Sequence, residues 1–140
     1  MAERLLLEVV TPDHLLLSQQ VDEVIAPGTE GEFGVLPGHC HFLSTLKIGE
    51  LRYRVGEVTS YMSVLWGFAQ VTPTKVTILA EIAEKAEDID VGRAETAVEK
   101  AKQRLEVGGL PSELKEAQIS LEKARLRKKI AERARRTSHS

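Results

Sequence analysis

Two different hydrophobic patterns divide the chain near residue 88. Before that point the apolar residues form short runs rich in Val, Ile, Leu, Tyr or Thr, separated by Gly, Pro and Asp. Short runs that repeat at about 8–12-residue spacing are typical of an antiparallel β-sandwich or barrel. The clearest predicted strands cover residues 5–11, 20–26, 50–55, 59–65 and 76–82.

Alternation within the predicted strands indicates which side chains face the core. In the segment LRYRV we expect Leu51 and Tyr53 to point inward and the two arginines outward, since successive strand residues face opposite sides. Large aromatic side chains are usually well buried in globular proteins. We therefore expect Phe42, Trp66 and Phe68 to belong to the core.

Beyond residue 88 the apolar residues recur every three or four positions, which is the period of an amphipathic helix. This pattern predicts one helix over about 91–106 and a second over about 112–135. Asp90 and Ser112 are the expected N-caps, because their side-chain oxygens can accept hydrogen bonds from the first turn. The short link at 107–111 would fold the helices into an antiparallel hairpin.

The apolar stripes of the predicted helices are rich in alanine. Alanine contacts bury little area, and apolar burial contributes only about 25 cal/mol per Å². Helices of this length are also marginal in water without packing. We therefore expect a mobile hairpin that can dock in more than one way. The stripe residues are Ala94, Ala97, Val98, Ala101 and Leu105 on the first helix, and Leu114, Ala117, Leu121 and Ala124 on the second.

Together the two patterns predict an α+β fold with two domains. Residues 1–86 would form the flattened antiparallel β-sandwich or barrel, and residues 87–140 the α-helical hairpin. Charge divides the chain at about the same place. Residues 1–88 carry 6 Lys or Arg and 13 Asp or Glu, a net charge of −7, whereas residues 89–140 carry 13 and 8, a net charge of +5. This asymmetry indicates different electrostatic roles for the two halves.

Composition narrows the class of protein. The chain has 42% hydrophobic and 29% charged residues, as an ordinary globular protein does. It has no run of about 18 apolar residues and no long apolar segment near its start, so we expect neither a transmembrane helix nor a signal peptide. The single cysteine excludes an intramolecular disulfide and suits a reducing compartment such as the cytoplasm.

Few motifs carry chemistry. His39, Cys40 and His41 place three potential metal ligands in a row, but a structural zinc site needs four ligands and the only other histidines are His14 and His139. We therefore interpret this segment as a turn followed by a half-buried strand. No nucleophile motif, P-loop or dinucleotide fingerprint occurs, so we expect neither a metal site nor an enzyme active site.

A basic segment at residues 123–136 holds eight Lys or Arg residues and one acid, Glu132. It could bind nucleic acid, fit a groove on an acidic protein, or form a solvated charged face. A small β-domain with a basic helical arm that binds nucleic acid is therefore an alternative function, and a free-standing nucleotide sensor is another. The few aromatic residues do not suggest an RNA-binding platform.

Five segments, in their order and at this chain length, carry a family resemblance. They are VVTPD at 9–13, GTEGEFGVLPGH at 28–39, WGFAQV at 66–71, VTILA at 76–80 and IDVGRA at 89–94. With them the chain resembles, over nearly its whole length, the epsilon subunit of bacterial F-type ATP synthases. The resemblance implies a β-sandwich of about ten strands followed by a helical hairpin.

The same resemblance implies a non-catalytic, regulatory role in a proton-translocating ATP synthase. The subunit would sit in the central stalk as part of the rotor, bound to the gamma subunit and the ring of c subunits, and couple rotation to ATP synthesis. Its hairpin would extend into the alpha/beta catalytic head and inhibit ATP hydrolysis. The expected location is the cytoplasmic face of the bacterial inner membrane, peripheral and without direct insertion. Neither nucleic acid nor a required cofactor is implied.

Candidate contact residues follow from positions that match the family pattern. Contacts with the gamma subunit and the ring are expected at Glu32, Pro37, Gly38 and His39. The catalytic head of the family presents acidic segments, so cations of the second helix are candidates for the inhibitory contacts. They are Arg125, Arg127, Lys128, Lys129, Arg133, Arg135 and Arg136.

Some bacterial epsilon subunits bind ATP in the folded hairpin as a regulatory ligand. At two matching positions the ATP-binding members favour arginine, whereas this chain has Lys100 and Lys123, and lysine lacks the bidentate phosphate geometry. Gly92 adds backbone freedom inside the first helical turn. By similarity the candidate ATP-binding residues are Glu84, Ile89, Asp90, Arg93, Ala94, Lys100, Lys123 and Arg127.

Overall fold

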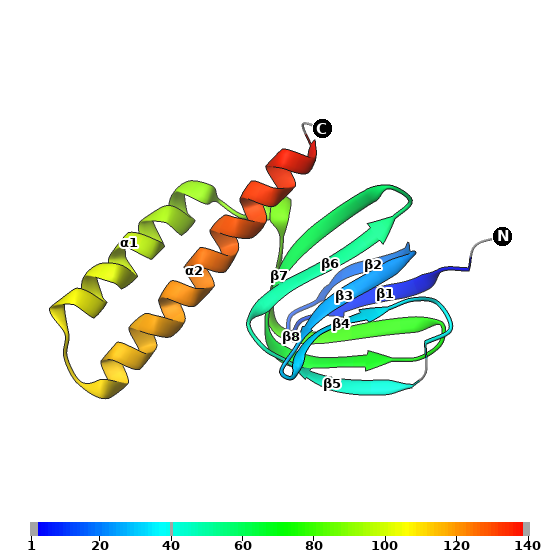
Figure 1. The fold of residues 1–140 in the computed structure, drawn as a ribbon, viewed down its shortest axis with the longest axis horizontal. Coiled ribbons are helices and arrows are strands. Elements are labelled where there is room, and N and C mark those ends of the chain that lie inside the picture. Colours follow the sequence, from blue (N-terminus) through cyan, green and yellow to red (C-terminus); the bar gives the residue numbers. More distant parts are fainter. Residues whose placement is uncertain (1–2, 40, 139–140) are drawn as a thin grey trace. The chain divides into compact units, whose positions relative to one another are not determined.

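The computed structural model describes the backbone of residues 3–39 and 41–138, and the side chains of these residues as far as Arg133. The chain forms two compact units, Met1–Lys85 and Ala86–Ser140, which are described separately below (Figure 1). The first unit consists of strands and the second of helices. The division between the units lies one residue before the predicted domain boundary.

Eight β-strands form the first unit within the described residues, where the resemblance implied about ten. They are β1 (Leu5–Val10), β2 (Leu15–Val21), β3 (Glu23–Gly28), β4 (Gly31–Val35), β5 (Phe42–Leu46), β6 (Gly49–Val55), β7 (Val58–Val71) and β8 (Lys75–Lys85). β7 is 14 residues long and pairs with β6 along its first half and with β5 along its second half. One continuous strand thus takes the place of two, which accounts for part of the difference.

The strands follow the order β2–β1–β8–β7–β5–β3–β4, and β6 pairs with both β3 and β7. Neighbouring strands are antiparallel except β1 and β8, which are parallel. The sheet therefore joins the first and last strands of the unit side by side. It folds over into the two layers of a β-sandwich, which are visible in Figure 1.

Aliphatic side chains from all eight strands fill the space between the layers. The predicted alternation in β6 is confirmed, because Leu51 and Tyr53 are buried while Arg52 and Arg54 remain partly exposed. Among the described residues, Tyr53 is the one aromatic residue of the buried core, and the partly buried Phe33 packs against this core. Burial of branched aliphatic side chains is the main favourable term for the stability of such a unit.

β7 changes the face that it presents to the core at Trp66 and Gly67. Before this point Met62 and Val64 are buried in the core, and after it Ala69 is. The inward positions thus shift from even to odd residue numbers, although the pairing with β8 keeps one register throughout. Trp66 has a φ of 49° and Gly67 a φ of 147°, so a left-handed bend in the backbone produces the change. The bend lets one strand pass from one layer to the other.

The prediction that three aromatic residues belong to the core was wrong. Phe42 is 40% exposed, Trp66 39% and Phe68 51%. The bend in β7 explains two of them, since it turns Trp66 and Phe68 to the outer face of the sheet. Phe42 stands at the start of β5, where its ring packs edge-on against that of Phe33 with 5.2 Å between the centroids.

A short 3₁₀ helix, η1 (Ala86–Asp88), opens the second unit, and the helices α1 (Val91–Val107) and α2 (Pro111–Ser138) follow. The predicted N-cap of α1 is confirmed, because Oδ1 of Asp90 accepts a hydrogen bond from the backbone N–H of Arg93 at 3.1 Å. The prediction that Ser112 caps α2 was wrong. The helix already begins at Pro111, whose fixed φ suits the first helical position.

The two helices form the predicted antiparallel hairpin with small side chains between them. Ala94, Val98 and Ala101 of α1 and Ala117 and Ala124 of α2 are buried. The remaining predicted stripe residues are partly buried, so the face assigned from the sequence is confirmed. No helix within the described residues is long and apolar enough to cross a membrane.

Candidate partner and nucleotide surfaces

The outer face of the sandwich carries a row of apolar side chains across four neighbouring strands. Leu15 of β2 pairs with Val10 of β1, Val10 with Leu79 of β8, and Leu79 with Phe68 of β7. Leu15 is 51% exposed, Leu79 45% and Phe68 51%. Contiguous exposed apolar side chains of this kind mark interaction surfaces in proteins that are otherwise polar outside.

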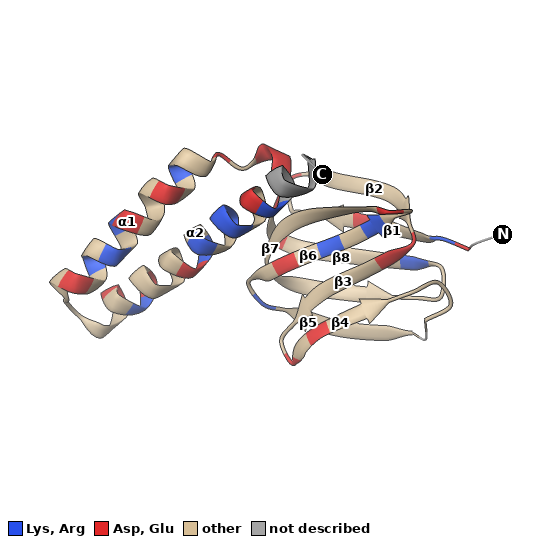
Figure 2. Cartoon of the chain, turned by 45° about the horizontal axis from the view of Figure 1, so that its top comes forward, with Lys and Arg blue, Asp and Glu red and all other residues tan. Residues whose placement is uncertain are grey.

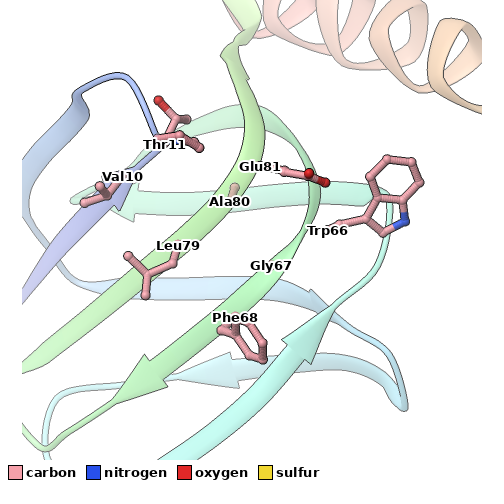
Figure 3. A pocket seen from close by; sticks show the side chains of 9 residues that line it. Val10, Thr11, Trp66, Gly67, Phe68, Leu79, Ala80 and Glu81 are labelled. Carbon is pink, nitrogen blue, oxygen red and sulfur yellow. The ribbon is translucent and has the colours of Figure 1, made fainter.

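One end of this row is hollowed. Figure 3 shows Phe68 and Leu79 on the sheet, with Trp66 extending from the bend of β7 and the Glu81 side chain reaching toward it. A side chain at Gly67 would overlap the carbonyl oxygen of Leu79, so only glycine lets β7 and β8 approach this closely. The hollow is lined by Val10, Thr11, Pro12, Trp66, Gly67, Phe68, Leu79, Ala80 and Glu81.

A second groove shares Phe68 with the first and continues toward the β3–β4 hairpin. Its apolar residues are Phe33, Phe42, Leu43 and Phe68, and its acids are Glu30 and Glu32. The two hollows therefore form one apolar surface bordered by carboxylates. A partner segment with apolar side chains next to Lys or Arg would complement it.

Glu32, a predicted partner contact, is held by a basic neighbour. Nη2 of Arg52 lies 3.4 Å from Oε1 of Glu32, and Nη1 of Arg52 lies 3.4 Å from Oε2 of Glu50. The Glu32 side chain remains 52% exposed, so it is positioned by Arg52 and still open to a partner. Two carboxylates around one guanidinium leave a net negative charge at this edge. Neither Arg52 nor Glu50 was predicted to contribute to a partner contact.

The other predicted contacts form a tight turn between β4 and β5. The backbone N–H of Gly38 donates to the carbonyl oxygen of Pro73 at 2.8 Å, and that of His39 donates to Leu36 at 3.1 Å. Gly38 has a φ of 87°, which favours glycine. The ring of His39 packs edge-on against Phe42, with 6.1 Å between the centroids. Pro37 and His39 are partly buried and Gly38 is exposed.

Cys40 and His41, which follow this turn, belong to the run of three potential metal ligands in the sequence. Cys40 lies outside the described residues, and His41 is exposed. In the described part of the chain, no group of three or more His, Cys, Asp or Glu side chains is arranged to hold a metal ion.

Asp22 joins two turns at one end of the sandwich. Its Oδ2 accepts a hydrogen bond from the backbone N–H of Gly56 at 2.6 Å, and its Oδ1 pairs with Arg4 at 3.2 Å. The hydrogen bond from Gly56 and, to a lesser degree, the charges of Arg4 and Arg54 hold the pKa of Asp22 below its ordinary value, against the opposing effect of burial.

In the helical unit, four of the eight predicted ATP-binding residues line one pocket. Asp90, Arg93 and Lys100 come from α1 and its cap, and Arg127 comes from α2. The volume of about 660 Å³ lies within the usual range for small-molecule sites. Three cations and one carboxylate give the pocket a positive charge, which suits an anionic ligand. Gly92, Thr96 and Ala97 complete the lining.

The other four predicted ATP-binding residues do not line this pocket. Ile89 and Ala94 are buried. Lys123 is partly buried on α2, one turn before Arg127. Glu84 belongs to β8 in the other unit. Thr96, which the sequence analysis missed, lies one turn after Arg93, and its hydroxyl donates to the carbonyl oxygen of Gly92 at 3.0 Å.

The candidate inhibitory cations lie along the second half of α2, where Lys and Arg gather in Figure 2. Arg125 and Lys129 are exposed, whereas Arg127, Lys128 and Arg133 are partly buried. The side chains of Arg135 and Arg136 lie outside the described residues. The cations therefore occupy more than one side of the helix.

Comparison with known families covers both units. The model of the ATP synthase, Delta/Epsilon chain, beta-sandwich domain matches residues 4–86, and that of the long alpha-helix domain matches residues 87–135. The ATP synthase epsilon chain of Syntrophobacter fumaroxidans is 51% identical over 133 residues, which cover 95% of this chain and 99% of that protein. The ATP synthase epsilon chain of Citrifermentans bemidjiense is 48% identical, with 97% and 99% covered.

Solved structures with the same fold come from mitochondrial ATP synthases. A chain in the OSCP/F1/c-ring structure from Euglena gracilis has a TM-score of 0.79 and 25% identity, with 96% of this chain and 82% of that chain covered. A chain in the central stalk/c-ring structure from Tetrahymena thermophila has a TM-score of 0.63 and 14% identity, with 93% and 98% covered, and shows the fold alone. The chain matches relatives over nearly its whole length, with about half of the residues identical, and both family models match it. This chain therefore belongs to the epsilon chains of F-type ATP synthases, which are non-catalytic subunits of the central stalk.

Proposed function

We propose that this chain couples rotation of the central stalk to ATP synthesis and that its hairpin inhibits ATP hydrolysis. The contrast between the two units supports this proposal most directly. The sandwich has an aliphatic core and a wide exposed apolar face, as a permanent joint requires. The hairpin is held mainly by alanine contacts and carries the excess of positive charge, as a movable inhibitor requires.

The joint would use the outer face of the sandwich. The apolar row with Phe68 and Leu79 is suited to a large, lasting interface, for which we propose the gamma subunit. Glu32 and the turn at Pro37, Gly38 and His39 would add polar contacts with gamma and the c ring. Attachment through the ring would hold the chain at the cytoplasmic face of the bacterial inner membrane without insertion.

Binding of the full-length chain to purified gamma subunit tests the joint. Phe68→Ser and Leu79→Ser should each weaken binding by about tenfold or more, because a covered apolar side chain contributes roughly 1.5–3 kcal/mol. Val58→Ser is the matched control, since Val58 is 62% exposed but lies outside the apolar row, at the β6–β7 turn. Equal affinity for all three variants would exclude this face as the gamma site.

The inhibitory role predicts that hydrolysis depends on the charges of α2. Replacing Arg125, Lys128, Lys129 and Arg133 by Gln should raise ATP hydrolysis by the assembled complex and leave proton-coupled synthesis intact. Replacing Lys102, Arg104 and Lys115 by Gln controls for the loss of charge elsewhere on the hairpin. A chain ending at Asp88 should also raise hydrolysis. Unchanged hydrolysis with both the charge variant and the shortened chain would contradict the inhibitory role.

ATP sensing by the hairpin is a second proposal, supported by the pocket with Arg93, Lys100 and Arg127. Phosphate oxygens would be bound by these cations, and Asp90 would fix the start of α1. Calorimetric titration should show saturable binding of ATP that is stronger than binding of ADP. Arg93→Ala should abolish it, whereas Lys102→Ala, on the same helix but outside the pocket lining, should not. No binding at about millimolar ATP would rule out useful sensing.

A further inference from the structure

Trp66 has an unusual backbone conformation. Among the described residues it is the one non-glycine residue with a positive φ. Bulky residues avoid this left-handed region because the side chain clashes with the backbone. Residues that nevertheless adopt it concentrate at functional sites, where the surrounding structure maintains the strained conformation. The adjacent Gly67 also has a positive φ, so the two residues make the bend of β7 together.

The bend does not require an indole. A glycine at position 66 would adopt the same φ without steric cost. Gly67 is constrained by contact, since any side chain there would overlap the backbone of β8, but the bend leaves Trp66 on the outer face and 39% exposed. The positive φ at position 66 therefore does not by itself account for the large side chain.

The neighbours of Trp66 indicate what the indole could bind. Trp66 lines the same hollow as Phe68 and the exposed Glu81, as Figure 3 shows. Glu81 forms no ion pair within the described part of the chain. A partner surface with an apolar recess and a nearby Lys or Arg would match both groups.

We propose that Trp66 is a preformed anchor that determines the affinity of this face for the gamma subunit, with the indole entering an apolar recess bordered by a basic residue. This inference rests on the proposed docking of gamma at the apolar row. Tryptophan contributes a large contact area with little loss of rotamer entropy, and it is enriched among residues that dominate interface affinity. The fixed backbone of the bend reduces the entropy lost on binding.

Two substitutions separate anchoring from a merely structural role of the indole. Trp66→Ala and Trp66→Gly both remove it, but only alanine keeps the unfavourable positive φ. The glycine variant should therefore melt a few degrees higher than the alanine variant. If Trp66 is an anchor, both variants should lose affinity for purified gamma by the same factor, of about thirtyfold or more.

Phe68→Ala and Leu79→Ala, measured in the same assay, identify which proposal fails. If they weaken binding and the Trp66 variants do not, the docking face stands and the anchor is excluded. If no variant weakens binding, the docking face itself is wrong. If Trp66→Gly binds like the unmodified chain while Trp66→Ala binds weakly, affinity follows the stability of the bend, and this outcome also overturns the anchor. Should Trp66→Ala not fold, Trp66→Gly still decides between loss and retention of affinity.

Discussion

The sandwich and the hairpin of this chain differ in what they bury. Of the twelve largest fully buried side chains, all except Ile130 belong to the sandwich. Apart from Ile89, Val98 and Ile130, the buried hydrophobic residues of the helical unit are alanines within the described part of the chain. Burial of a large aliphatic side chain stabilises a unit several times more than burial of alanine. The sandwich is thus built to keep its shape, whereas the hairpin can exchange its contacts at a small cost in free energy.

The largest expected effect lies in the sandwich core. Leu51→Ala should lower its unfolding free energy by about 2–5 kcal/mol, because the deletion leaves a cavity among close-packed side chains. Val98→Ala in the hairpin should cost far less. Fluorescence of the single tryptophan reports on the sandwich, and circular dichroism at the helix minimum reports mainly on the hairpin. If each substitution changed both signals equally, the two units would not differ in the way described.

A smaller effect is expected at the turn between the helices. Gly108 has a φ of 82°, and a side chain there would contact nothing within 4 Å. Gly108→Ala should therefore destabilise the hairpin by about 1 kcal/mol through backbone conformation alone. Helical circular dichroism should melt at lower temperature while tryptophan fluorescence stays unchanged. Gln103→Ala, at an exposed position on α1, should leave both signals in place and serves as the control.

The smallest effect concerns Asp22. Its folded-state pKa is lowered, so its contribution to stability is present above the ordinary pKa and is lost as pH falls through the folded-state value. Asp22→Asn should slightly lower the denaturation midpoint of the sandwich near pH 7, and this difference should shrink below about pH 4. Asp13→Asn, at an exposed turn, is the matched control. A difference that persists unchanged in acid would mean that the carboxylate charge does not matter.

Sequence patterns predicted the units well and one strand poorly. Alternation placed Leu51 and Tyr53 correctly because β6 keeps one face inward along its length. The expectation that large aromatic residues are buried misplaced Trp66 and Phe68, because β7 exchanges its faces at a left-handed residue that is not glycine. Gly67 is a sign of a bend, since glycine inside a strand often marks one, but the positive φ of Trp66 could not be predicted from its residue type. Ser112 was predicted to cap the second helix because its side-chain oxygen can accept a hydrogen bond. The helix instead begins one residue earlier, at Pro111, whose fixed φ suits a helix.

The candidate sites could be predicted only where their residues lie close together in sequence. Arg93 and Lys100 lie two helical turns apart on one face of α1, so their spacing already placed them together. Arg127 joined them through the antiparallel hairpin. Thr96 carried no signal, because a hydroxyl inside a helix is common. Arg52 could be predicted to face outward, but its position between two carboxylates depends on a strand distant in sequence.

The parallel pairing of β1 with β8 has a mechanical consequence. β8 leads directly into the helical unit, so any pull on that unit reaches the sandwich through this strand. β8 is hydrogen-bonded to β1 on one side and to β7 on the other. The ladder with β7 runs as far as Lys85, next to the helical unit, whereas the ladder with β1 covers only residues 75–79. A force along β8 would therefore have to shear the ladder with β7 before it reached the ladder with β1. Attachment to an inner strand therefore protects the sandwich from unravelling when the helical unit is pulled.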